Sequence, residues 1–204
     1  MHLVDPRILG VMILFLLGML VTIKRVATGS ILDKPEGSLL VRLVNVFNLF
    51  FLLVVNPLAA ILLIARRLPA ADPTHAAVAE PWLLMVLEII GLALYAVGYL
   101  LMAGALITLK RNYQLGGSAP RAEDRMVTDG PYSLVRHPMY AAALSIALGL
   151  AGLTQSWAFF GVFCIYLVLL GLLIPIEEDG LRHVHGEQYA AYQRRVGMLV
   201  PHLF

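Results

Sequence analysis

Two polar segments of the sequence, separated by apolar residues, carry side chains that could bind a small polar ligand. Residues 130–140 end a polar stretch and include Arg136, His137 and Tyr140, and residues 177–179 supply three consecutive carboxylates. A carboxylate can accept hydrogen bonds from hydroxyl or ammonium groups, and a histidine can hold a carboxylate or the edge of a base. Together the two segments are suited to a zwitterionic cofactor that carries a sugar and a base.

The same residue types leave two alternatives open. Zinc could be bound by ligands drawn from His137, His183, His185, Glu177 and Glu178. The sequence has no HExxH motif and no firm ligand spacing, so we expect no metal site. In the other alternative, His183 and His185 are solvated helix residues, and the two glutamates only place favourable charge at the N-terminus of a helix.

The composition indicates an integral membrane protein. The chain has 204 residues, of which 60% are hydrophobic and 14% charged, and its mean hydropathy is +0.82. Soluble domains contain about half apolar and about a quarter charged residues. The apolar segments are long and do not alternate as strands do, so we expect helices, which satisfy their own backbone hydrogen bonds in lipid. The net charge of +2, with basic residues spread between the apolar runs, indicates no nucleic-acid partner.

The apolar runs predict about five transmembrane helices, at residues 8–23, 43–64, 82–109, 139–153 and 157–174. The last two are joined by a three-residue linker and should form an antiparallel hairpin. Residues 177–195 mix a rough apolar stripe with charges, as expected for an interfacial helix that folds back. We therefore expect an all-α integral membrane protein whose C-terminal interfacial helix covers a cofactor site at the cytoplasmic face. Residues 1–110 would form a three-helix region and residues 111–204 the cofactor-binding region of one compact unit.

The distribution of basic residues predicts the orientation. With five spans and the N-terminus outside, Arg7, Arg66 and Arg67 lie outside, and the other twelve of the 15 Lys and Arg residues lie in cytoplasmic segments. Residues 136–140 and 177–178 then share the cytoplasmic face, so topology brings them together there. The small size favours a multi-pass protein of a prokaryotic inner membrane.

The motifs of the C-terminal part resemble the isoprenylcysteine carboxyl methyltransferase family, which belongs with the membrane phospholipid methyltransferases. The resemblance covers about residues 125–201 and is carried by DGPY at 129–132, RHPMY at 136–140, the pair Glu177-Glu178, HGEQY at 185–189 and Tyr192. It implies an enzyme that uses S-adenosylmethionine and buries this cofactor under its C-terminal segment. The lipophilic substrate would enter from the bilayer, and membrane lipids would be further partners. The reaction would be a direct in-line methyl transfer from the sulfonium.

The resemblance also implies roles for individual residues. The positions that match the family's cofactor-binding residues are Arg125, Met126, Val127, Tyr132, His137, Pro138, Met139, Tyr140 and Glu177, with Glu178 adjoining them. The helix with Tyr189 and Tyr192 resembles the family's lid. The candidate bases are Glu88, Glu178 and His137, and Glu88 qualifies because an ionisable residue at membrane depth is a functional candidate.

One departure concerns the substrate. Carboxyl methyltransferases of this family have an arginine shortly before the acidic pair, whereas this chain has only Leu172, Leu173, Ile174 and Pro175 there. A phospholipid amine, a thiol or a lipid hydroxyl is therefore an alternative acceptor to a prenylcysteine carboxylate, and Arg194 or Arg195 is a candidate replacement for the arginine. Two further alternatives are a non-catalytic membrane binding module of the same fold and a membrane reductase that uses a nicotinamide cofactor.

Overall fold

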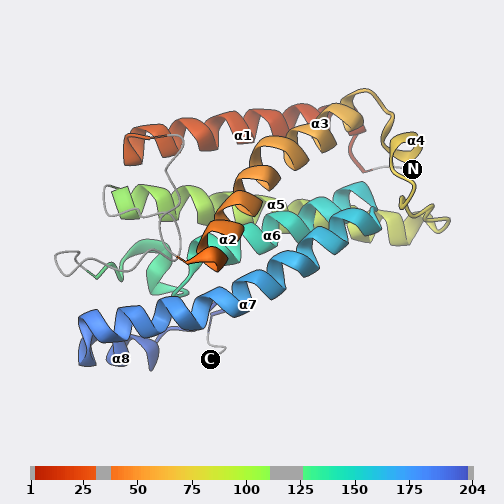
Figure 1. Ribbon diagram of the computed structural model, residues 1–204. Helices are drawn as coiled ribbons and strands as arrows, with labels where there is room; N and C mark the ends of the chain where they lie inside the picture. The colour runs from red at the N-terminus through yellow and green to blue at the C-terminus, as the bar shows by residue number, and fades with distance from the viewer. Residues whose placement is uncertain (1–2, 31–37, 111–125, 202–204) are drawn as a thin grey trace.

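The protein is an all-helical bundle, as expected from the sequence (Figure 1). A computed structural model describes residues 3–30, 38–110 and 126–201. In these ranges four helical segments are long and apolar enough to cross a membrane, Pro6–Thr28, Leu39–Ile64, Pro81–Leu109 and Trp157–His185. The expected integral membrane fold is thus confirmed, and the fifth apolar helix, α6 (Pro138–Thr154), is shorter than these four.

The second long segment is irregular in its middle. It consists of α2 (Leu39–Phe50), the π-helical turn η1 (Phe51–Val55) and α3 (Asn56–Ile64). The irregular turn ends two residues before Pro57, which has no backbone N–H. The Asn56 amide donates a 3.1 Å hydrogen bond to the Phe51 carbonyl, and its oxygen accepts one of 3.2 Å from the Tyr95 hydroxyl. Asn56 therefore links two helices, as a buried asparagine in a membrane bundle is expected to do.

The centre of the bundle is the antiparallel pair α5 (Pro81–Leu109) and α6, which lie side by side. Glycines form the contact between them. A Cβ atom added to Gly149 would lie 2.7 Å from the Tyr95 backbone nitrogen, and one added to Gly98 would lie 2.8 Å from the Ala142 carbonyl oxygen. Because small residues let the two backbones approach closely, this contact fixes the position of α6 along its whole length.

The helix α7 (Trp157–His185) corrects the prediction for the acidic pair. We expected the apolar helix to end near residue 174 and an interfacial helix to begin at Glu177. Instead, α7 continues through Pro175, and the chain turns at Gly186, whose φ of +53° suits a residue without a side chain. The folded-back helix is only α8 (Glu187–Gln193). Glu177 and Glu178 consequently lie inside a long helix and not at a helix N-terminus.

The elements with the candidate residues meet at one end of the bundle, which we call the polar end. Here α1 (Pro6–Thr28) and α5 end, α6 begins, and α7 ends and turns into α8, at the left of Figure 1. The N-terminus and the short helix α4 (Leu68–Ala71) lie at the opposite end. The polar end thus combines the segments before α6 with those after α7.

Candidate functional site at the polar end

The segment before α6 is held in place by the C-terminal segment. A 3-10 turn, η3 (Gly130–Ser133), leads into α6, and Pro138 occupies the first turn of this helix, where its missing N–H has no cost. The backbone N–H of Arg136 donates to the Gly197 carbonyl at 2.8 Å, and that of His137 donates to the Met198 carbonyl at 3.1 Å. We call residues 187–201, which include α8 and these carbonyls, the C-terminal strap.

Arg136 and Glu178 form a buried ion pair at the centre of the site. The Arg136 Nε lies 2.8 Å from Glu178 Oε1, and each side chain is only 7% exposed. The Glu178 Oε1 atom also lies 3.2 Å from His137 Nε2, and its Oε2 accepts a 2.9 Å hydrogen bond from the Gln193 amide. A buried charge is tolerated only when it is paired and hydrogen-bonded, and Glu178 meets this condition through three residues from two parts of the chain.

His137, Tyr140 and Glu177 form a second group beside the ion pair. The Tyr140 hydroxyl donates a 2.8 Å hydrogen bond to Glu177 Oε2, and the His137 Nδ1 lies 3.9 Å from the same oxygen. The rings of His137 and Tyr140 are stacked, with centroids 5.5 Å apart. The Glu177 side chain remains 22% exposed, so a ligand at the surface of the site can reach its carboxylate.

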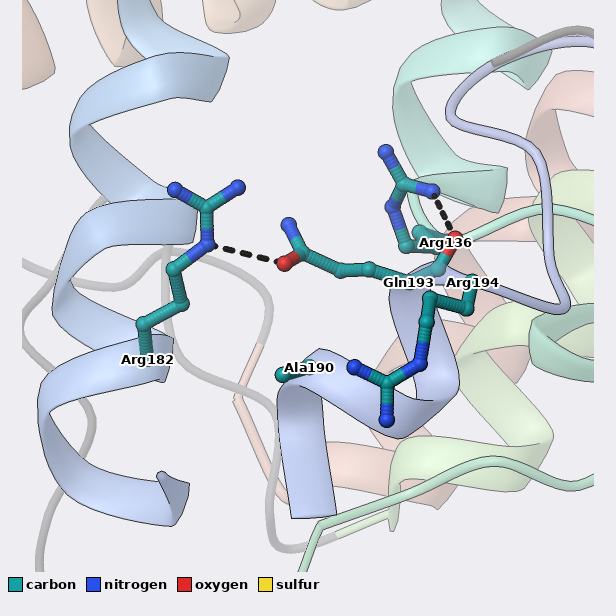
Figure 2. A pocket seen from close by; sticks show the side chains of 5 residues that line it. All are labelled: Arg136, Arg182, Ala190, Gln193 and Arg194. Atoms are coloured by element: carbon teal, nitrogen blue, oxygen red, sulfur yellow. Dashed lines mark hydrogen bonds between the residues drawn. The ribbon is translucent and has the colours of Figure 1, made fainter. Parts of the chain in front are cut away.

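Gln193 connects the strap to α7 and to Arg136 in the segment before α6 (Figure 2). Its carbonyl oxygen accepts a 3.1 Å hydrogen bond from Arg136 Nη1, and its side-chain oxygen accepts one of 2.8 Å from Arg182 Nε. Since its amide nitrogen donates to Glu178, this one side chain joins two consecutive turns of α7 to α8. The Tyr192 hydroxyl adds a hydrogen bond to the Tyr132 carbonyl. The strap is therefore fastened over the ion pair by side chains as well as by backbone.

Two tyrosines of the strap differ in how their hydroxyls are satisfied. Burial raises the pKa of Tyr192 to about 12, and its hydroxyl has the Tyr132 carbonyl as a partner. Burial also raises the pKa of Tyr189, and the nearby Glu178 carboxylate adds to this effect. The Tyr189 side chain is 2% exposed, yet among the residues that the structure describes its hydroxyl oxygen has no hydrogen-bond partner. Such an oxygen costs about 1–3 kcal/mol when buried, so it marks a position where a ligand group could bind.

Comparisons with known proteins agree with the sequence motifs. The profile of the phospholipid methyltransferase family matches residues 86–188, just over half of the 204 residues. The chain belongs to this family. The expected resemblance to the isoprenylcysteine carboxyl methyltransferases and their phospholipid methyltransferase relatives is thus confirmed.

Three curated relatives of this chain are named for three different functions. The chain is 32% identical over 121 residues to the cobalt-zinc-cadmium resistance protein CzcN of Cupriavidus metallidurans, which is 59% of this chain and 50% of that protein. It is 36% identical over 72 residues to the methanethiol S-methyltransferase of Pseudomonas deceptionensis, 35% of this chain and 27% of the relative. It is 30% identical over 123 residues to the protein-S-isoprenylcysteine O-methyltransferase B of Arabidopsis thaliana, 54% of this chain and 57% of the relative.

The structure gathers part of the predicted cofactor-binding set. His137, Tyr140, Glu177 and Glu178 are brought together, as described above. Pro138 is buried, while Met139 packs against the apolar cluster around Leu20 and Leu106, away from the polar groups. The remaining predicted positions that the structure describes, Met126, Val127 and Tyr132, are half-buried in the segment before α6. Arg125 lies outside the described residues.

The structure does not bring Glu88 and Arg195 to the same cluster. Glu88 is buried in α5, where its carboxylate accepts a 2.6 Å hydrogen bond from the Leu3 backbone. The adjacent Leu87 carbonyl faces Gly152, which lies roughly 20 Å along α6 from His137 at 1.5 Å per residue. Arg195 is exposed and donates to the Ala191 carbonyl of its own strap. Glu88 therefore belongs to the opposite end of the bundle, and Arg195 is oriented by local backbone.

Glu178 also differs from its predicted role as a base. Its carboxylate is paired with Arg136 and accepts further hydrogen bonds from Gln193 and the His137 ring. A carboxylate with these partners is stabilised in its charged form. Its Oε1 is engaged by Arg136 and His137, and its Oε2 by Gln193 of the strap. Its geometry is that of a positioning residue.

Sequence reasoning missed two residues of the site. Tyr189 was assigned only to a lid, and its unsatisfied hydroxyl has no signature in the sequence. Gln193 was not considered, because a glutamine that precedes two arginines on a predicted surface helix carries no signal for a buried contact. Among the residues that the structure describes, no three His, Cys, Asp or Glu side chains are grouped so that they could hold a metal ion.

Proposed function

We propose that the protein is a membrane methyltransferase that transfers the methyl group of S-adenosylmethionine to a lipophilic acceptor. The observation that carries this proposal is the double connection between the start of α6 and the end of α7, Arg136 to Glu178 and Tyr140 to Glu177, each at 2.8 Å. Membership of the phospholipid methyltransferase family supports the same reaction class.

The groups left available at the site suit this cofactor. When bound, S-adenosylmethionine supplies an electrophilic methyl group on a positively charged sulfur. Glu177 offers a partly exposed carboxylate with one oxygen held by Tyr140, and it would accept hydrogen bonds from ribose hydroxyls or the ammonium group. The unsatisfied hydroxyl of Tyr189 would bind a further polar group of the ligand. We propose His137, Tyr140, Glu177 and Tyr189 as the residues that hold it.

The other residues of the site would act by positioning and by excluding water. The Arg136–Glu178 pair fixes the start of α6 against α7, and Gln193 fastens the strap above them. Holding two reactants in line in a site without water accounts for a large part of the barrier reduction in such transfers. With its proton on Nε2, where Glu178 accepts it, His137 keeps the lone pair of Nδ1 to receive a proton from the acceptor.

We propose a thiol or an amine as the acceptor, in preference to a carboxylate. Among the described residues of the site, the buried cation is Arg136, and Glu178 already neutralises it. Glu177 adds negative charge next to it, so an acceptor carboxylate would be repelled. A thiol agrees with the name of the Pseudomonas relative, a methanethiol S-methyltransferase, whereas the Arabidopsis relative is named for an isoprenylcysteine substrate.

The acceptor would reach the site from the bilayer, and the site would face the cytoplasm of a prokaryotic inner membrane. This orientation rests on the excess of basic residues in the segments at the polar end. Since a polar cofactor is made in the cytosol, the same orientation would give it access to the site.

The proposal is tested by methyl transfer to three acceptors that share one alkyl chain and end in a thiol, an amine or a carboxylate. Purified protein in lipid nanodiscs would be supplied with S-adenosylmethionine labelled in its methyl group. We expect label in the thiol or the amine, and loss of it in the His137→Ala variant. Preferential labelling of the carboxylate would contradict the acceptor class, and absence of label from every acceptor and from the nanodisc lipids would contradict the reaction.

A further inference from the structure

A hollow of about 550 Å³ lies between α7 and the strap, and none of the residues proposed above to hold the cofactor is in its lining (Figure 2). It is open to the surroundings, and its lining consists of Arg136, Arg182, Ala190, Gln193 and Arg194. Three of these five residues are arginines, and no carboxylate is among them. Two helices contribute to the hollow. Arg182 belongs to α7, and Ala190 and Gln193 belong to α8, while Arg136 comes from the segment before α6.

The three arginines differ in how far they are committed to other groups. Arg136 is buried and holds Glu178, so it contributes positive charge to the wall of the hollow but keeps its partner. Arg182 and Arg194 have side chains that are 54% and 64% exposed. Their ion pairs are with the exposed carboxylates of Asp179 and Glu187, at 3.4 Å and 2.7 Å. Exposed pairs of this kind contribute about 0–1 kcal/mol, so another anion can replace the carboxylates at little cost.

The chemistry of the hollow selects a phosphate group. Guanidinium groups match the oxygen geometry of phosphate and bind it with two parallel hydrogen bonds. In Figure 2, the side chains of Arg182 and Arg194 flank Ala190, the smallest residue of the lining, from two sides. An anion above Ala190 would therefore be reached from α7 and from the strap at once.

The depth of the hollow in the membrane indicates the source of the phosphate. The helix α7 begins at the exposed Trp157, an interfacial anchor, and has 29 residues. A hydrocarbon core takes about 20 residues of it, so the helix leaves the core near residue 176. Arg182 then lies roughly 9 Å further along the axis, in or at the edge of the headgroup layer, and arginine side chains of this length can reach back toward the interface. Lipid phosphates occupy this layer.

We propose that the hollow between Arg182 and Arg194 binds a phosphate-bearing anion, supplied at this depth by the headgroup of an anionic membrane lipid. The bound phosphate would replace Asp179 and Glu187 as the partner of the two arginines. It would bridge α7 to the strap and add to the Gln193 connection that holds the strap closed. This site needs neither the cofactor nor the acceptor, so it is independent of the proposed methyl transfer.

The test measures lipid binding to delipidated protein in detergent. Phosphatidylglycerol, phosphatidylcholine and inorganic phosphate would be titrated separately at constant ionic strength. Retained ligand is counted by native mass spectrometry, and the thermal midpoint reports stabilisation of the fold, since a ligand that binds the folded state raises it. We expect phosphatidylglycerol to bind and to raise the midpoint of the wild type, with little response to phosphatidylcholine.

Three variants locate the site. Arg194→Gln removes a guanidinium whose ion pair is exposed, and should weaken phosphatidylglycerol binding by roughly tenfold or more, as expected for the loss of a charge-assisted contact. The double variant Arg182→Gln/Arg194→Gln should abolish it, with the midpoint of each lipid-free variant reporting whether the fold persists. Arg195→Gln is the matched control, because Arg195 belongs to the same strap and does not line the hollow.

The outcomes separate the sources and can overturn the proposal. Binding of inorganic phosphate that depends on Arg182 and Arg194 and competes with phosphatidylglycerol would support the anion site and make the free anion its occupant. Unchanged lipid binding in Arg194→Gln and the double variant would contradict it. Equal loss of binding in Arg195→Gln would also contradict it, since the effect would then follow the total charge and not the hollow.

Discussion

The helix α6 is held by its two neighbours in opposite ways. Against α5 it is held by the close approach of backbones, because glycines have no side chain at the points of contact. Against α7 it is held at the polar end by side chains, through the buried pair of Arg136 with Glu178 and the hydrogen bond of Tyr140 to Glu177. The first contact has no room for an added Cβ atom at its glycines. Near the second, the hydroxyl of Tyr189 in α8 has no hydrogen-bond partner among the described residues.

The contact of α6 with α5 serves as a scaffold, whereas its contact with α7 forms part of the candidate site. Close apolar packing fixes the distance between α5 and α6, and with it the position of everything attached to the start of α6. The polar contact between α6 and α7 contains charges whose burial has a cost, and α8 brings the unsatisfied hydroxyl of Tyr189 to the same end of the bundle. Groups of this kind are retained where they bind or position a ligand. Changes to the two contacts should therefore have different consequences for stability and for binding.

The largest effect on stability should come from Glu178→Ala. This change leaves the Arg136 guanidinium buried without its carboxylate, and removal of one partner from a buried ion pair costs about 3–5 kcal/mol. It also removes the acceptor for the Gln193 amide. Thermal unfolding in detergent measures the loss, with Asp179→Ala as the control, because the neighbouring Asp179 side chain is 76% exposed. Equal thermal midpoints for Glu178→Ala and Asp179→Ala would mean that the Arg136–Glu178 ion pair does not hold the strap.

Gly149→Ala should produce the next largest effect. The new Cβ atom would lie 2.7 Å from the Tyr95 nitrogen and 2.8 Å from the Gly91 carbonyl oxygen, so α5 and α6 must separate. Overpacking of this kind costs about 1–3 kcal/mol. The control is Gly171→Ala on α7, where an added Cβ meets no atom within 4 Å and alanine should be neutral or stabilising in the helix. If both variants unfold like the wild type, the glycine contact does not determine the spacing of the helices.

Glu177→Gln should affect binding and leave stability nearly unchanged. The amide oxygen can still accept the hydrogen bond from Tyr140, but the negative charge that the cofactor would contact is lost. Loss of a hydrogen bond to a charged group costs about 1.5–3 kcal/mol, which is roughly a tenfold or larger reduction in affinity. Titration with S-adenosylhomocysteine measures it, and Asp179→Asn is the matched control on the same helix turn. A large fall in thermal stability would instead place Glu177 with the structural contacts.

The smallest effect should come from Tyr189→Phe, and its two readouts should move in opposite directions. Removal of an unsatisfied hydroxyl should leave the stability unchanged or raise it by up to about 1 kcal/mol, while ligand affinity falls about threefold to tenfold. In the control Tyr192→Phe, the lost hydroxyl donates to the Tyr132 carbonyl, so stability should fall by about 1 kcal/mol. Unaltered ligand affinity in Tyr189→Phe would show that its hydroxyl is not part of the site.

The sequence was informative where a property is carried by residue type and spacing. Long apolar runs predicted the membrane helices, and the RHPMY segment with the acidic pair predicted the groups that meet at the polar end. Topology was sufficient to bring His137 and Glu177 to one end of the bundle, because His137 directly precedes α6 and Glu177 lies in the last third of the returning helix α7.

Features that depend on three-dimensional contact were not accessible to the same reasoning. The apolar run predicted a helix that ends near residue 174, but α7 continues through Pro175 to His185. A proline inside a membrane helix is tolerated when its surroundings satisfy the freed groups. Glu88 looked functional for its charge at membrane depth, yet α5 runs antiparallel to α6 and carries it to the opposite end of the bundle. The close contacts of Gly149 and the three-way role of Gln193 become visible only when the helices are placed side by side.

The most direct test of the central claim, that the polar end holds S-adenosylmethionine, is calorimetric titration of the purified protein with S-adenosylhomocysteine, beside NADPH. We predict saturable binding of the first alone, and strong loss of it in His137→Ala and Glu177→Ala variants that remain folded. Wild-type affinity in both variants would place the cofactor elsewhere. Well-folded wild-type protein that binds neither compound would contradict the assignment in favour of a non-catalytic module, and binding of NADPH in its place would point to a reductase.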